Sequence, residues 1–137
     1  MANLVALDTS VAVPLLLASH QAHDRVYEWA LSRQVVLCAH SLVETYSVLT
    51  RLPGDHRVSA EDAVRVMDTW FPEPLMLSQA GTVDVHRRLA SAGVAGGAVY
   101  DGLVALTALE NGVPLASRDR RAVNNYLSLG VDVRLVP

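Results

Sequence analysis

One predicted helix and the strand that follows it would bring two carboxylates into the same pocket. Asp101 lies near the start of the helix, and Asp119 follows the strand. The sequence predicts a helix over residues 98–111, ended by Gly112, and then a strand over 113–116. Asp101 shares a helix face with apolar residues, so its charge would lie at the edge of the core, where it is unfavourable unless it is paired. Asp119 follows the strand, at the end where open α/β sheets bind ligands, although it could also cap the next helix.

Asp8 and Glu44 hold related positions after two earlier strands. Asp8 follows a continuous apolar strand over residues 4–7, and Glu44 lies in the first turn of the helix after a strand over 35–39. Each also has a structural interpretation, because Asp8 could cap the following helix and Glu44 has the spacing of a capping box with Ser41. Taken singly, these acids are better explained as caps. Taken together, they predict one acidic site.

Several carboxylates in one pocket favour a bound divalent cation. Like charges raise each other's pKa or recruit a cation, and oxygen ligands without Cys or His favour Mg²⁺, or else Mn²⁺. Magnesium keeps several waters and takes the rest of its shell from a few carboxylates and from substrate phosphates. The pattern therefore predicts phosphate chemistry. The five histidines are scattered and offer no evident pair for attack by a 2′-hydroxyl; His20 and His23 share a helix face and are expected to be exposed.

The composition indicates one compact domain over residues 1–137, with 51% hydrophobic and 18% charged residues. A net charge of −3 excludes a protein that coats nucleic acid by charge alone, so a polyanion would need a local basic patch. All 11 basic residues are arginine. The single cysteine, Cys38, lies in an apolar run and is expected to be buried and inert. Residues 1–4 lack the basic start of a signal peptide, and no apolar run could span a membrane, so we expect a soluble, cytoplasmic protein.

The alternation of strands and helices predicts an α/β fold in three layers, α/β/α, with a mainly parallel sheet of four to five strands. A helix over residues 11–17 would hold Pro14 in its first turn, and Ser59 with Asp62 has the spacing of a cap. Gly130 would end a helix over 122–129. The expected strands cover residues 4–7, 35–39, 75–77, 113–116 and 131–136, with the last on the outside and 75–77 at a sheet edge.

Four segments together resemble a PIN domain, and in particular the VapC toxins of toxin-antitoxin pairs. They are Val5–Ser10, Glu44 within a helix, Tyr100–Ala105 and Leu115–Ala122. The likeness covers essentially the whole chain, with the motifs in order. It implies a Mg²⁺-dependent endoribonuclease that acts on structured RNA such as tRNA or rRNA, usually as a homodimer silenced by a cognate antitoxin.

The resemblance assigns the four acids to one site, with the residues Asp8, Glu44, Asp101 and Asp119. Asp8 and Asp101 would hold the metal directly or through its waters, while the other two shape its shell and orient the attacking water. The products would carry a 3′-hydroxyl and a 5′-phosphate. Ser117 stands where the family most often has threonine. Where many PIN domains carry a further acid shortly after Asp119, this chain has Arg120, Arg121 and Ala122, so the likeness does not extend to a second firmly held metal.

Substrate contacts are expected around the same segments. Thr9 or Ser10 would hydrogen-bond a phosphate or cap a helix, with Ser117 nearby. The arginines Arg118, Arg120 and Arg121 would grip the RNA backbone or form a solvated turn. Tyr100 and Trp70 could stack on bases, although aromatic residues beside apolar positions usually belong to the core.

Other functional classes fit the sequence less well. A phosphatase with Asp8 as nucleophile would want an acid where Ser10 stands, a receiver domain would want a lysine, and an NTPase would want a glycine-rich phosphate loop. The remaining alternative is a non-catalytic PIN-like module that binds RNA or a protein partner, and the presence of all four acids argues against it.

Overall fold

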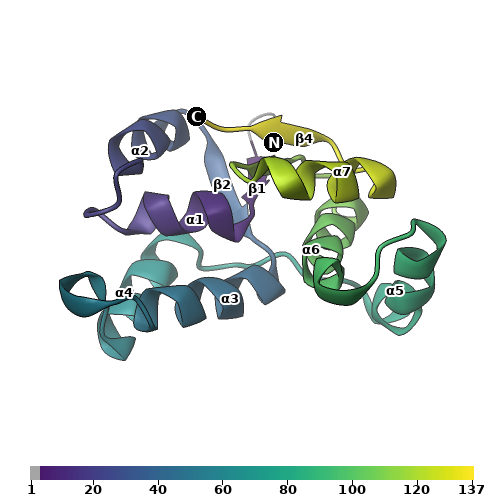
Figure 1. Ribbon diagram of the computed structural model, residues 1–137, viewed down its shortest axis with the longest axis horizontal. Helices are drawn as coiled ribbons and strands as arrows, with labels where there is room; N and C mark the ends of the chain where they lie inside the picture. The colour runs from purple at the N-terminus through teal and green to yellow at the C-terminus, as the bar shows by residue number, and fades with distance from the viewer. Residues whose placement is uncertain (1–3) are drawn as a thin grey trace.

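The computed structural model describes residues 4–137, and its centre is a parallel sheet of four strands in the order β2-β1-β3-β4 (Figure 1). The strands are β1 (Leu4–Leu7), β2 (Gln34–Leu37), β3 (Leu115–Ser117) and β4 (Val133–Leu135). The predicted parallel sheet of four to five strands is therefore confirmed, with the last strand at an edge. Most of the stretch on which the signal-peptide prediction was based, residues 1–3, lies outside the described part of the chain.

Seven α-helices connect and cover the strands in the described range. They are α1 (Thr9–Leu16), α2 (His23–Leu31), α3 (Ala39–Thr50), α4 (Ala60–Trp70), α5 (Gln79–Ser91), α6 (Val99–Glu110) and α7 (Arg120–Leu129), with short 3₁₀ turns η1 (Gly54–His56) and η2 (Gly96–Ala98). Within residues 4–137, none of the helices combines the length and the apolar character that crossing a bilayer requires.

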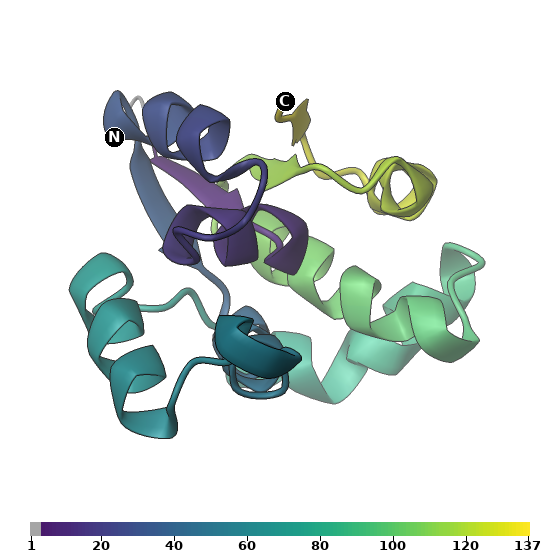
Figure 2. The ribbon, with the colours of Figure 1, turned by 60° about the vertical axis from the view of Figure 1, so that its left-hand side comes forward.

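The sheet separates two apolar clusters, which confirms the three-layer arrangement (Figure 2). Alternate residues of β1 face opposite sides: Val5 and Leu7 pack into a cluster with α1, α2, α3 and α4, whereas Ala6 packs into a cluster with α5, α6 and α7. Both faces of β1 are buried, which explains its unbroken apolar sequence. All strands point the same way, so their carboxyl ends lie at one edge of the sheet.

Two local predictions need correction. Pro14 lies inside α1, beyond the first turn, because the helix begins at Thr9 rather than at Val11. Residues 75–77 do not form a strand in the described structure; only Leu75 bridges to Cys38 beside the end of β2. Prolines crowd the approach to Leu75 and remove backbone donors, which limits pairing there.

Other local predictions are confirmed. Ser59 caps α4 by accepting a hydrogen bond from the Asp62 backbone N–H at 3.2 Å. Gly112 and Gly130 follow α6 and α7 with φ of 67° and 86°, the left-handed conformation that glycine adopts without strain. Cys38 is fully buried, and burial raises the pKa of its thiol to about 12, so the group stays protonated and inert.

Candidate functional site

The four acidic residues predicted from the sequence meet at the carboxyl edge of the sheet. Asp8 lies between β1 and α1, Asp119 lies between β3 and α7, Asp101 is in the first turn of α6, and Glu44 is in the second turn of α3. The pKa of Asp101 is raised, first by burial and then by the negative charges of the other three acids. The charges are therefore concentrated in one place, and we call this group the acidic rim.

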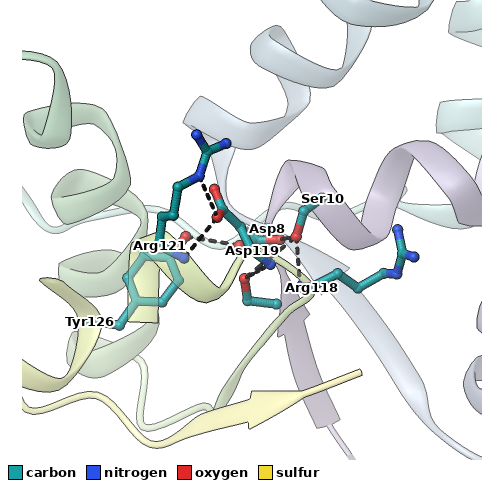
Figure 3. Close-up of polar contacts among 7 residues, drawn as sticks. Asp8, Ser10, Arg118, Asp119, Arg121 and Tyr126 are labelled. Atoms are coloured by element: carbon teal, nitrogen blue, oxygen red, sulfur yellow. Dashed lines mark hydrogen bonds and ion pairs between the residues drawn. The ribbon is translucent and has the colours of Figure 1, made fainter. Parts of the chain in front are cut away.

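Asp8 is the most enclosed member of the acidic rim, with 6% of its surface exposed. Its Oδ1 accepts a hydrogen bond from the Ser10 hydroxyl at 2.5 Å, and its Oδ2 accepts one from the Tyr126 hydroxyl at 2.9 Å (Figure 3). Burial raises the pKa of Asp8, and these hydrogen bonds partly oppose the rise. Although Asp8 precedes α1, its side chain makes no capping bond. Asp8 therefore occupies the N-cap position of α1, as predicted, while its carboxylate is directed to Ser10 and Tyr126.

Glu44 reaches from α3 to the start of α1. Its Oε1 accepts a hydrogen bond from the Thr9 hydroxyl, and its Oε2 lies 3.9 Å from His40 Nε2. The predicted capping box with Ser41 is wrong, because α3 begins at Ala39 and places Ser41 inside the helix. Since its helix starts earlier than predicted, Glu44 projects from the second turn and its carboxylate is available to the site.

Asp119 combines a structural role with a place in the acidic rim. Its Oδ1 accepts a hydrogen bond from the Arg121 backbone N–H at 3.0 Å, so the predicted cap of α7 is confirmed. Its own N–H donates to the Ser117 hydroxyl at 3.0 Å. The Ser10 hydroxyl accepts a hydrogen bond from the Arg118 N–H at 2.8 Å (Figure 3). These contacts tie the turn after β3 to the start of α1.

The three predicted hydroxyl ligands of substrate are turned toward the acids. Thr9 bonds Glu44 and Ser10 bonds Asp8, while Ser117 is fully buried beneath them. Their hydroxyls therefore orient the carboxylates and the turn after β3. This arrangement gives all three a positioning role, and the full burial of Ser117 is incompatible with a direct contact between its hydroxyl and the substrate.

The three predicted basic contacts differ in availability. The Nε of Arg118 donates a hydrogen bond to the Pro137 carbonyl at 3.0 Å, which directs this guanidinium toward the C-terminus. The Nε of Arg121 lies 3.6 Å from Asp119 Oδ1, although almost all of its side chain is exposed. Arg120 is exposed at the first position of α7. Arg120 and Arg121 are the ones that remain exposed beside the acidic rim.

Tyr126 is a site residue that the sequence interpretation missed. It lies on α7, is 1% exposed, and donates its hydroxyl hydrogen to Asp8. Burial raises its pKa far above the usual range, and the charges of Asp8, Asp101 and Asp119 add to the rise, so the phenol stays a hydrogen-bond donor. Its spacing of seven residues from Asp119 places both on one helix face, and a buried tyrosine needs a partner for its hydroxyl. This spacing is the sequence feature that could have identified Tyr126 as a site residue.

The two predicted stacking aromatics have different environments. Trp70 is partly buried against the core and meets the Tyr27 ring edge-on, with the centroids 5.9 Å apart. Tyr100 is 57% exposed and therefore does not belong to the core. His20 and His23 are half-buried rather than exposed, which corrects their prediction; His23 Nδ1 lies 2.8 Å from the Pro14 carbonyl oxygen.

Comparison with known proteins identifies the family of the chain. The sequence model of the PIN domain matches residues 5–126. The chain belongs to the PIN domain family. The chain is also 50% identical over 129 residues to Ribonuclease VapC27 of Mycobacterium tuberculosis, covering 94% of both proteins.

Two solved structures share the fold of this PIN domain at low sequence identity. One, described as FitAB bound to an IR36 DNA fragment, has a TM-score of 0.72 and 22% identity, with 96% of this chain and 94% of the other covered. The other is M. tuberculosis VapC20, described as a sarcin-ricin loop cleaving toxin, with a TM-score of 0.70 and 18% identity over 97% and 99% of the two chains. Both likenesses support the PIN fold seen here.

The acidic rim of this PIN domain consists of carboxylate oxygens, the donors that a hard divalent cation prefers. In residues 4–137, no three carboxylate, imidazole or thiol groups close around a single point as the direct ligands of an ion would. The four carboxylates nevertheless concentrate negative charge, which raises the pKa of Asp101 after burial. Mg²⁺ retains several waters and uses few protein ligands, so the chemistry of these residues fits such an ion.

Proposed function

We propose that this PIN domain is a Mg²⁺-dependent endoribonuclease toxin of the VapC type, which uses water to cleave structured RNA such as tRNA or rRNA. The observation that carries the proposal is the convergence of four carboxylates, in which the charges of the other three add to the rise that burial causes in the pKa of Asp101. The name of the relative VapC27, a ribonuclease, and the description of VapC20 as a toxin that cleaves an RNA loop support the assignment.

In the proposed site, Asp8 and Asp101 hold the metal, directly or through its waters. The bound ion would offset negative charge on the phosphate and lower the pKa of a water. Ser10 and Tyr126 fix the Asp8 carboxylate through its two oxygens. Because neither donor carries a charge, the carboxylate keeps its full charge for the cation.

Glu44 and Asp119 complete the proposed machinery. Thr9 holds one oxygen of Glu44, and the other faces His40 at 3.9 Å, so this carboxylate is placed to orient a water and to accept its proton. Asp119 is fixed by the N–H of Arg121 at 3.0 Å. We assign Arg120 and Arg121 to the RNA backbone, and Thr9, Ser10, Ser117 and Arg118 to substrate positioning around the site. Attack by water leaves a 3′-hydroxyl and a 5′-phosphate.

We further propose an inhibitor, an oligomeric state and a cellular location for the protein. A VapC-type toxin implies a cognate antitoxin as inhibitor, a homodimer and a cytoplasmic location. We also propose that residues 1–137 form a single PIN-like domain, which the match to residues 5–126 and the 94% mutual coverage with VapC27 support. The alternative, a PIN-like module that binds RNA or a partner without cutting it, predicts binding without cleavage.

The decisive experiment is cleavage of total cellular RNA with Mg²⁺, with Mn²⁺ and with EDTA. We expect cleavage with either metal, none with EDTA, and none by Asp101→Asn. The matched control is Asp132→Asn, which changes an exposed acid at the amino end of β4. Cleavage in EDTA, or equal cleavage by Asp101→Asn, would refute the metal assignment. Sequencing the new RNA ends identifies the target and tests for 5′-phosphates.

A further inference from the structure

Tyr100 is an exposed aromatic residue beside the acidic rim. It lies in the first turn of α6, directly before Asp101, and 57% of its surface is exposed. Its ring is parallel to that of His40, with the centroids 5.6 Å and the planes 8° apart. The stack joins α3 to α6, so His40 supports one side of the tyrosine ring while much of the rest stays open to solvent.

The stacked pair is attached to the same turns that carry two of the acids. His40 lies one helical turn before Glu44 on α3, with its Nε2 3.9 Å from the carboxylate, and Tyr100 adjoins Asp101 in sequence. The two rings therefore border the acidic rim on the α3 and α6 side. Arg120 and Arg121 lie on α7, which follows Asp119. A nucleic acid crossing the rim would meet cations on one side and aromatic rings on the other.

We infer that Tyr100, supported by His40, is a substrate-positioning residue on which an unpaired RNA base next to the cleaved phosphodiester stacks. This inference rests on the proposed ribonuclease function. Aromatic side chains bind splayed-out bases through their ring faces, without any need for positive charge. Such a contact suits this chain, because its net charge is −3 and Arg118 is directed to the C-terminal carbonyl. Stacking adds affinity where the acids themselves repel phosphates.

The base contact can be observed without cleavage. The probe is a set of short single-stranded RNAs that carry the fluorescent base 2-aminopurine at each position in turn, bound in Mg²⁺ to the Asp8→Asn protein. The amide that replaces the Asp8 carboxylate in this variant can accept a hydrogen bond from the Tyr126 hydroxyl and donate one to the Ser10 hydroxyl. The surroundings of position 8 are therefore preserved. We expect strong quenching at one position. Adding Tyr100→Ala removes that quenching, whereas adding Tyr100→Phe, which keeps the ring, retains it.

The same contact predicts a kinetic signature in the otherwise unchanged protein. Tyr100→Ala is expected to raise KM about tenfold with kcat nearly unchanged, because stacking contributes to binding. Replacing the stacked base by an abasic site gives the same loss in the wild-type protein and no further loss in Tyr100→Ala. The control is Tyr27→Ala, an exposed tyrosine on α2 that meets Trp70 and lies outside the acidic rim.

The outcomes separate this inference from the proposed function. Quenching that does not depend on Tyr100, or an unchanged KM in Tyr100→Ala, would overturn the stacking contact even if the protein cleaves RNA. If Mg²⁺ supports no cleavage while quenching still requires Tyr100, the ribonuclease proposal fails and the base contact stands.

Discussion

The two ends of the central sheet carry different kinds of site. At the carboxyl end, the acidic rim brings four carboxylates together with hydroxyl partners. At the amino end, a cavity of about 780 Å³ is lined by residues that include Trp29, Arg33, Asn111 and Arg134, and none of the described lining residues is acidic. This cavity therefore lacks the carboxylates that could hold a metal. In this PIN domain, the concentration of carboxylates marks the candidate site.

Helix polarity helps to explain why the four acids of the acidic rim share the carboxyl end of the sheet. In a parallel sheet, helices begin near the carboxyl ends of strands, and helix N-termini carry partial positive charge. Asp8 and Asp119 immediately precede α1 and α7, and Asp101 is in the first turn of α6. The fold itself thus favours acids at one edge.

The largest expected effect comes from Asp8→Asn. Removing the enclosed carboxylate should lower RNA cleavage at least about a hundredfold, the size of loss seen when one key electrostatic group is removed from an active site. The variant should stay folded, because an amide can bond both Ser10 and Tyr126. Cleavage rates and circular dichroism would test both points. Near-normal cleavage by a folded variant would contradict the assignment of Asp8.

Tyr126→Phe should have a smaller effect than the loss of either metal-holding acid, a decrease of about tenfold to a hundredfold in cleavage, as is usual when a partner of a metal-binding carboxylate is removed. The Tyr126 hydroxyl helps to lower a pKa of Asp8 that burial raises. Without it, the Asp8 pKa should rise further, and activity should therefore be lost at a higher pH on the acidic side. Tyr27→Phe is the matched control. An unchanged pH–rate profile would remove Tyr126 from the site.

Asp101→Asn should stabilise the fold at neutral pH. The folded pKa of Asp101 is raised by burial and by its acidic neighbours, so the folded state binds its proton more tightly than the unfolded state, and stability falls as pH rises through this range. Asp101→Asn has no carboxyl group to ionise, so its stability does not fall with pH for this reason. For this half-buried group we expect about 1 kcal/mol, or roughly 3–5 °C in Tm. The gain should disappear at a pH low enough to protonate Asp101; a gain that persists there would contradict this cause.

The smallest effect is expected at the amino end. Arg33 lies over the Trp29 ring at 4.5 Å, so Arg33→Ala should cost about 0.5 kcal/mol of stability from the lost cation–π contact. Urea unfolding would measure this change. RNA cleavage should be unaffected, since the residue is far from the acidic rim along the sheet. A large loss of cleavage would show that the two ends are coupled.

Sequence patterns predicted the sheet and the convergence of the acids because these depend on local rules. The apolar run of β1 indicated a strand buried on both faces, and Gly112 and Gly130 marked the ends of two helices. Patterns failed where an interaction depends on a distant segment. Ser41 and Glu44 have capping-box spacing, yet α3 starts at Ala39. Spacing alone could not reveal that Glu44 would instead bond Thr9, 35 residues earlier.

The sequence by itself determined which residues lie at the strand ends, since the order of strands and helices fixes the edge to which each acid belongs. Only the tertiary structure decided how those acids are held and what surrounds them. Tyr126 reaches Asp8 across 118 residues, and Tyr100 stays exposed because its ring stacks on His40 rather than entering the core. Burial and long-range hydrogen bonds arise from packing between whole elements, which no local pattern contains.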